Sequence, residues 1–282
     1  MKAFPFVLKK YPMLGTNNYI KWLLDDIDQY TSDGRKVKVL NLEHKEEVPV
    51  LSDLARHLRN HYCSDNDIDD LRSATGETRA KYLERYKFPN KTVTPGPSIR
   101  AGDFGEILVA DYAQYILNYN VPRTRYEMKS TRNESTHGTD VLGFKIIDID
   151  APTNNDELLT VEVKSEFSTS TGTSLQRAFD ESKKDYEVRK AESLNAMKQR
   201  LKLKNDTTTV KIVERFQDKT SKPYKEVSGA ATVVSNDNWT DSIITGADTS
   251  SHPNAEILLV AVRGADLMDL TNSLYERACN EA

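Results

Sequence analysis

The stretch GTDVLGFKIIDIDAPTNNDELLTVEVKSE, residues 138–166, decides the fold class. It holds two apolar runs joined by a polar turn, a pattern that predicts two adjacent strands. Asp140 stands at the mouth of the first run, and Glu162 and Lys164 interrupt the second. Burying a charge costs free energy unless the charge is paired or binds a metal. These three residues therefore need a structural or a chemical reason.

The spacing of Glu162 and Lys164 places them on one face of a strand. Residues i and i+2 point to the same side, so Val161 and Val163 point the other way into a core. If the two strands form a hairpin, the start of the first lies near the end of the second. Asp140 then meets Glu162 and Lys164 at one end of the sheet.

This arrangement predicts a metal site. Hard carboxylate oxygens suit Mg²⁺ or Mn²⁺, and Mg²⁺ usually takes one or two protein carboxylates plus waters and phosphate oxygens. Asp140 and Glu162 are the expected ligands. Such a metal lowers the pKa of a bound water and offsets charge on a scissile phosphate. Lys164 would position or help to deprotonate that water, or stabilise developing negative charge.

The Glu-x-Lys spacing alone is a weak signal, because the chain contains it four times. Only the pair Glu162–Lys164 has β-branched neighbours on both sides and an Asp leading the strand before it. The alternative interpretation is a salt-bridged strand end with solvated charges, and the interruption of an apolar strand argues against it. The four pairs are Glu43–Lys45, Glu127–Lys129, Glu162–Lys164 and Glu181–Lys183.

Glu106 is a further candidate catalytic residue and metal ligand. The run from Asp103 to about Asn118 predicts a buried helix, and Glu106 lies on its apolar, inward side. Asp103 and Glu106 also have the spacing of a helix N-cap and its reciprocal partner, a capping box. The sequence leaves both interpretations of Glu106 open.

Three other features are weaker candidates for a functional site. His137 is a candidate base or phosphate contact, although a loop histidine is more often neither. Gln176 is a candidate contact to a metal-bound water or to a backbone phosphate, and the Ser/Thr-rich loop before it is either a phosphate donor or a helix cap. Residues 173–204 hold nine Lys and Arg against five Asp and Glu, a local excess of four positive charges that predicts either a solvated face or a contact with DNA or a partner.

Composition excludes several classes of protein. The formal net charge is -4, so the chain lacks the overall basic character typical of many nucleic-acid binders. The two cysteines, Cys63 and Cys279, have no metal-ligand spacing and are expected to be free thiols in a reducing cytosol. Residues 1–15 lack a signal-peptide pattern, and no segment approaches 18 apolar residues. We expect a cytoplasmic protein with no membrane span.

The chain divides best at the Pro- and Gly-containing stretch 89–98. Residues 1–95 predict a mainly helical accessory or docking region. Residues 99–282 predict an α/β domain whose mixed sheet is flanked by helices. The expected helices cover 17–30, 51–62, 67–88, 103–118, 174–204 and 264–282, and the expected strands cover 123–130, 140–149, 157–165, 229–235 and 256–262.

The order of a helix carrying Glu106, strands carrying Asp140 and Glu162-Val-Lys164, a helix and a further strand resembles the PD-(D/E)xK nuclease core over residues 99–282. The resemblance implies that Asp140, Glu162 and Lys164 stand at the motif positions and Glu106 at the frequent helical acid. The chain has Thr139 where the motif has proline, a departure that is common in the superfamily. The resemblance implies a restriction-endonuclease-like fold and a Mg²⁺-dependent deoxyribonuclease.

Four stretches carry a narrower resemblance. FGEILVADY, HGTDVLGF, LLTVEVKS and LLVAVRGADLMDLTNSLYERA resemble the HamA family, the nuclease subunits of the Hachiman antiphage defence system. This resemblance implies a DNA nuclease that is held in check by, and activated through, a helicase partner of the HamB type. Nothing in the composition or the spacing points to a helicase.

Two alternatives remain at this stage. One is a standalone restriction-type endonuclease, which the acidic charge and the lack of a DNA-reading motif in the first 95 residues disfavour. The other is a non-catalytic interaction module that keeps the nuclease fold, which the intact set of Asp140, Glu162 and Lys164 disfavours.

Overall fold

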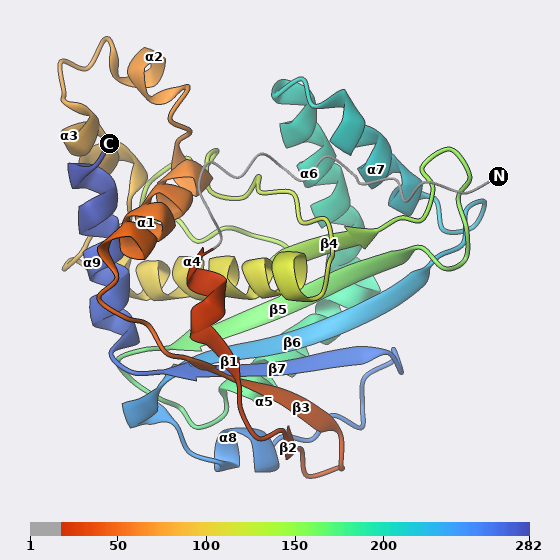
Figure 1. Ribbon diagram of the computed structural model, residues 1–282. Helices are drawn as coiled ribbons and strands as arrows, with labels where there is room; N and C mark the ends of the chain where they lie inside the picture. The colour runs from red at the N-terminus through yellow and green to blue at the C-terminus, as the bar shows by residue number, and fades with distance from the viewer. Residues whose placement is uncertain (1–17) are drawn as a thin grey trace.

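A curled mixed sheet forms the centre of the computed structural model, which describes residues 18–282 (Figure 1). The expectations about residues 1–15 lie outside the described residues. In the order of the sheet, the strands are β1 (Leu23–Asp25), β3 (Lys36–Leu42), β7 (Ile257–Gly264), β6 (Lys225–Ser235), β5 (Glu157–Glu166) and β4 (Val141–Lys145), and β2 (Gln29–Tyr30) pairs with β3.

The sheet is parallel in the middle and antiparallel at its edges. Strand β6 runs parallel to β5 and β7, and β3 runs parallel to β7. At the two edges, β4 pairs antiparallel with β5 and β1 pairs antiparallel with β3. Parallel strands need both faces covered, and the near-continuous burial along β6 agrees with that requirement.

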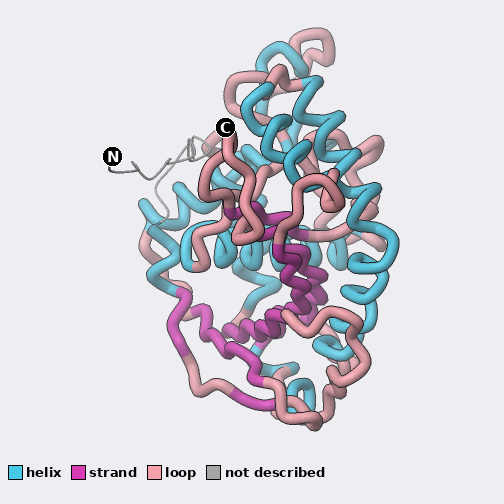
Figure 2. Tube along the Cα trace, turned by 90° about the vertical axis from the view of Figure 1, so that its right-hand side faces the viewer, coloured by secondary structure: helices cyan, strands magenta, loops and turns pink. Residues whose placement is uncertain are grey.

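Helices cover both faces of the sheet, as Figure 2 shows with the strands seen as one curved layer. The predicted mixed α/β sheet flanked by helices is confirmed at this level. On one side lie α1 (Val48–Tyr62), α4 (Gly96–Asp111) and α9 (Leu267–Asn280), with the short α2 (Ile68–Arg72) and α3 (Arg79–Tyr82) beyond them. On the other side lie α5 (Ser174–Lys184), α6 (Lys190–Leu203), α7 (Thr207–Gln217) and α8 (Ser242–Thr245).

Two predicted elements are wrong. Residues 17–30 were expected to form a helix, but they contain a 3₁₀ helix at Asn18–Trp22 followed by β1 and β2. The spacing of the apolar residues in this stretch is compatible with a helix or with a strand. Pairing with β3 favours the strands. Residues 123–130 were expected to form a strand, but no strand is assigned there.

The segment 121–129 has no assigned strand, and three of its cations pair with acids on α4. We call it the basic segment. The pairs are Asp111 with Arg123 (2.5 Å), Glu106 with Arg125 (3.2 Å) and Asp103 with Lys129 (2.5 Å). These ion pairs hold the segment against α4, where a carboxylate without a partner would be costly.

The segment 18–95 shares the sheet and the core with the rest of the chain. Strand β3 pairs with β7, and α1 packs against α9. The helical character predicted for this segment holds for α1 to α3 but not for β1 to β3. The sheet therefore continues across the predicted boundary near residue 95, and a docking role for the segment stays a prediction.

Two smaller expectations can be compared with the structure. Cys63 and Cys279 are both free thiols. Within residues 18–282, no helix combines the length and the apolar character needed to cross a lipid bilayer.

Asp111 ties the N-terminal segment to α4. It is fully buried, and it accepts hydrogen bonds from the Tyr19 hydroxyl and from Arg123, with His57 Nε2 at 2.9 Å. Burial raises the pKa of Asp111, but the charges of His57 and Arg123 outweigh burial and hold that pKa below its usual range. The stabilising contribution is therefore present at neutral pH and lost in acid, as the pH falls through that lowered pKa.

We expect Asp111→Ala to lower the free energy of unfolding by about 3–5 kcal/mol, because Tyr19, His57 and Arg123 would all lose a fully buried partner. Urea unfolding at neutral pH measures the loss. Asp69→Ala is the matched control, because Asp69 pairs with Arg72 and Arg79 at the surface and should cost little. Equal losses in the two variants would contradict a special role for the Asp111 cluster.

Candidate functional site

The register of β4 and β5 brings Asp140 beside the Glu-x-Lys residues. Val141 pairs with Val161, so Asp140, one residue earlier, lies next to Glu162 across the antiparallel pair. The Asp140 carboxylate accepts a hydrogen bond from the backbone N–H of Val163 at 2.8 Å. This bond fixes Asp140 at the same end of the sheet as Glu162 and Lys164.

Glu162 is buried, but only one of its two carboxylate oxygens accepts a hydrogen bond. Its side chain lies on β5 with 5% of the residue exposed. Oε1 accepts a hydrogen bond from Lys164 Nζ at 2.7 Å. Oε2 accepts none from any described residue, and Arg189 Nη2 lies 3.8 Å from it. Glu162 therefore has one lone-pair-rich oxygen available to another ligand.

Glu106 joins the group through Arg125. Its Oε2 accepts a hydrogen bond from the Tyr126 hydroxyl at 2.6 Å and lies 3.2 Å from Arg125 Nε. Arg125 also donates to Asp140 Oδ1 at 2.9 Å, so one guanidinium bridges two of the predicted site acids. Helix α4 begins at Gly96, well before Asp103, so the capping-box interpretation of Glu106 is wrong.

A glycine allows α4 to approach the end of β5. A Cβ at Gly105 would lie 2.0 Å from Ser165 Oγ, closer than any real contact. Without a side chain at this position, the helix sits directly on the strand that carries Glu162 and Lys164. The close approach places the next residue of the helix, Glu106, near the same end of the sheet.

Burial and mutual repulsion raise the pKa of two of these acids. Burial, reinforced by the charge of Asp140 and opposed by Lys164, raises the pKa of Glu162 to about 8. Burial, opposed by Arg125 and reinforced by Asp140, raises the pKa of Glu106 to about 8. The cluster therefore favours an additional cation, whether a proton or a metal ion, at neutral pH.

Asp185 is a fourth acid that the sequence analysis missed. It follows α5 in a π-helical turn, Asp185–Arg189, and it is fully buried. Its Oδ1 lies 2.9 Å from Arg189 Nε. Burial raises the pKa of Asp185 to about 6 despite Arg189, and the charge of Asp140 adds to the rise. In the sequence, Asp185 and Arg189 look like an ordinary surface pair at helical spacing, so nothing marks them as buried.

Arg125 was missed for a different reason. It lies in residues 123–130, which were expected to form a strand, so no contact between Arg125 and the site acids was foreseen. The one available signal is the run of cations at residues 123, 125 and 129, which follows a helix with three acids on its inner side.

Of the weaker candidate residues, His137 lies near the site, whereas Gln176 and the Ser/Thr-rich loop have other partners. His137 is exposed and lines the same cavity as Glu106 and Asp140. Gln176 bonds Asp180 and the backbone of Asp248, so its contacts do not involve the acids of the site. In the Ser/Thr-rich loop, Ser170 and Thr171 bond Glu166 rather than presenting their hydroxyls to a ligand.

The donor set fits a magnesium or manganese ion held by few protein ligands. Within residues 18–282, no group of three or more His, Cys, Asp or Glu side chains is placed to hold a metal ion together. Mg²⁺ commonly needs only one or two carboxylates, with water and phosphate oxygens completing its shell. The unpartnered Oε2 of Glu162 and the neighbouring Asp140 carboxylate supply such a pair.

Comparison with known proteins adds one finding. A family model described as HamA matches residues 17–278, nearly the whole chain. No curated protein matches the sequence.

We expect Glu106→Gln to gain stability relative to the wild type as the pH rises from about 5 to about 9. With a pKa near 8 in the folded state and an ordinary value of 4.5, Glu106 holds a proton that the unfolded chain releases, so the wild type loses stability as the pH rises through this window. Glutamine has no such proton, and the difference should grow by up to about 1.4 kcal/mol per pH unit.

Urea unfolding across this pH range measures the difference in free energy. Glu43→Gln, at an exposed site, controls for the loss of one negative charge. A constant difference between Glu106→Gln and the wild type would show that Glu106 is not held in its protonated form.

Proposed function

The chain belongs to the HamA family and is thus a component of Hachiman antiphage defence, and from this premise we propose that it is a metal-dependent DNA nuclease of the PD-(D/E)xK type. The reaction is hydrolysis of a phosphodiester bond. The single observation that carries the proposal is the hydrogen bond from Val163 N–H to Asp140, because it sets this acid beside Glu162 and Lys164 at one end of the sheet.

The order of elements supports this nuclease type. Helix α4 carries Glu106, β4 begins just after Asp140, and β5 carries Glu162 and Lys164. Helix α5 and strand β6 follow, and β6 lies parallel to β5. This is the succession expected of a PD-(D/E)xK core, with Thr139 in place of the proline.

Each residue has a distinct task in the proposed reaction. Asp140 and Glu162 would hold the metal, with Glu106 as a further acid of the site. When bound, the metal supplies Lewis acidity and a bound water of lowered pKa. Lys164, held 2.7 Å from Glu162 Oε1, places a positive charge at the site, where it can orient water or offset charge on a phosphate oxygen.

The family also implies a partner within the Hachiman complex. We propose that this partner is a helicase of the HamB type, which restrains the nuclease and delivers DNA to it. A nuclease without strict sequence recognition endangers its own genome, so restraint by a partner is a plausible need. The segment 18–95 offers α1 to α3 at one end of the molecule as a docking surface (Figure 1).

We expect Glu162→Ala and Lys164→Ala each to reduce cleavage of plasmid DNA with Mg²⁺ by about a hundredfold or more, because Glu162 would hold the metal and Lys164 would offset charge on the reacting phosphate. Nicking assays measure the rate, and melting curves show whether the variants remain folded. Lys45→Ala is the matched control, since it removes an exposed lysine from another Glu-x-Lys pair. Cutting at the wild-type rate by either site variant would overturn the mechanism.

We expect co-expression with a HamB-type helicase to give one stable complex on size-exclusion chromatography, with an interface well above about 2,000 Å². The isolated chain should cut DNA only weakly. Separate elution of the two proteins, together with vigorous cutting by the chain alone, would favour a standalone restriction-type endonuclease.

A further inference from the structure

A hollow of about 250 Å³ lies between helix α6 and the loop of residues 128–138. Arg200 on α6 and His137 on the loop both line it. The basic stretch 173–204 and His137 are separate in the sequence. In the fold, Arg200 of that stretch and His137 line the same hollow. We call this hollow the α6 groove.

The α6 groove lies beside the candidate site. A second, narrower cavity is lined by Glu106 and Asp140, and it shares Arg125, His137 and Arg200 with the groove. A chain lying in the groove would therefore run next to two acids of the site.

Arg200 is a cation without an anion. The residue is partly exposed, and its guanidinium makes no ion pair or hydrogen bond with any side chain or backbone group of residues 18–282. Burial lowers the pKa of Arg200, and the like charge of Arg125 lowers it further. An anion in the groove would pair with this guanidinium and offset its repulsion from Arg125.

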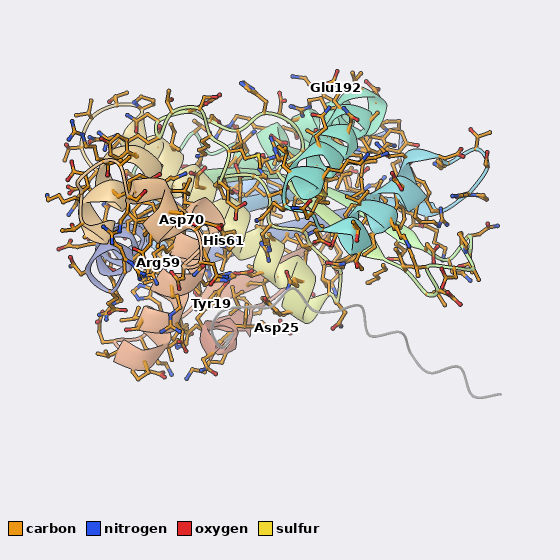
Figure 3. The ribbon with its side chains drawn as sticks, turned by 90° about the horizontal axis from the view of Figure 1, so that it is seen from above. Tyr19, Asp25, Arg59, His61, Asp70 and Glu192 are labelled. Carbon is orange, nitrogen blue, oxygen red and sulfur yellow. The ribbon has the colours of Figure 1, made fainter. Side chains whose placement is uncertain are left out.

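The other charges of the groove are already engaged or lie at its rim. Arg125 pairs with Glu106 and Asp140, and Lys129 pairs with Asp103. Glu134, an acid of the groove, accepts hydrogen bonds from the backbone N–H groups of Ser130 and Thr131. Glu192, the other acid, is exposed on α6 near the outer edge of the view in Figure 3.

We propose that the α6 groove binds the phosphodiester backbone of the nucleic-acid substrate, with Arg200 and His137 contacting phosphates next to the bond that is cut. The proposal rests on the nuclease function proposed above. A guanidinium matches the geometry of phosphate oxygens, and His137 adds a ring nitrogen that can donate a hydrogen bond. The connection to Asp140 favours the substrate over an acidic segment of a partner protein, which would block the site.

The test separates binding from cleavage by using the full chain with Glu162→Gln as the parent. Fluorescence anisotropy with a labelled DNA strand, repeated over a range of KCl concentrations, gives the affinity and its salt dependence. Adding Arg200→Ala should weaken binding about three- to tenfold and lower the slope of log K against log salt by about 1, because one phosphate contact is lost. Arg200→Lys should keep most of the slope.

Lys202→Ala is the matched control, because Lys202 is an exposed cation on the same helix that lines neither cavity. Its slope should change by much less than that of Arg200→Ala. The melting temperature of Arg200→Ala should not fall, since the lost guanidinium has no partner and faces Arg125. A clear fall would mean that Arg200 is a structural residue and would overturn the proposal.

Two outcomes distinguish this proposal from the nuclease function. If the parent binds DNA and Arg200→Ala leaves both affinity and slope unchanged, the groove proposal fails while the nuclease function stands. If Arg200→Ala also weakens the complex with the helicase, the groove serves a protein partner instead, and the proposal again fails. If Arg200→Ala changes the slope as expected but the wild type never cuts DNA, the groove is confirmed and the nuclease function fails.

Discussion

Three buried acids on one helix set the main constraint on this fold. Asp103, Glu106 and Asp111 all lie on the inner side of α4, where each needs a cation, a hydrogen bond or a proton to offset its charge. The basic segment 121–129 supplies one cation to each of them. The need to pair these charges fixes the path of the chain between α4 and β4, although the segment has no regular structure. Each contact draws one residue of the segment to α4, so the three contacts together hold the segment in place.

The candidate site is built on this framework. Arg125 belongs to the basic segment, and its guanidinium reaches past Glu106 to Asp140 at the start of β4. Asp140 in turn accepts the N–H of Val163, between Glu162 and Lys164. A continuous chain of contacts thus runs from α4 to β5. The Arg125 guanidinium that pairs with Glu106 on α4 also orients Asp140, the acid expected to bind the metal. Arg125 therefore contributes both to the stability of the fold and to the proposed site.

The sequence predicts the parts of the fold that depend on local periodicity. Strands β4 and β5 follow from their apolar runs, and the convergence of Asp140 with Glu162 follows from the pairing of an antiparallel hairpin. Partners distant in the sequence are harder to foresee. Arg125 and Asp185 become site residues only because the basic segment and the turn after α5 pack against the same sheet edge. A pattern read over a few residues cannot reveal such contacts, because the energy that fixes them comes from elements elsewhere in the chain.

Contacts to α4 also come from both sides of the boundary predicted near residue 95. The stretch 89–98 has the residues of a linker, but Gly96 already lies in α4. Tyr19 and Tyr62, both before that stretch, donate hydrogen bonds to Asp111 and Asp103 on the same helix. The buried acids of α4 are therefore satisfied from both sides of the apparent linker. A partner that bound the N-terminal segment would act on groups that hold α4, and through α4 and Arg125 the contact extends to the candidate site.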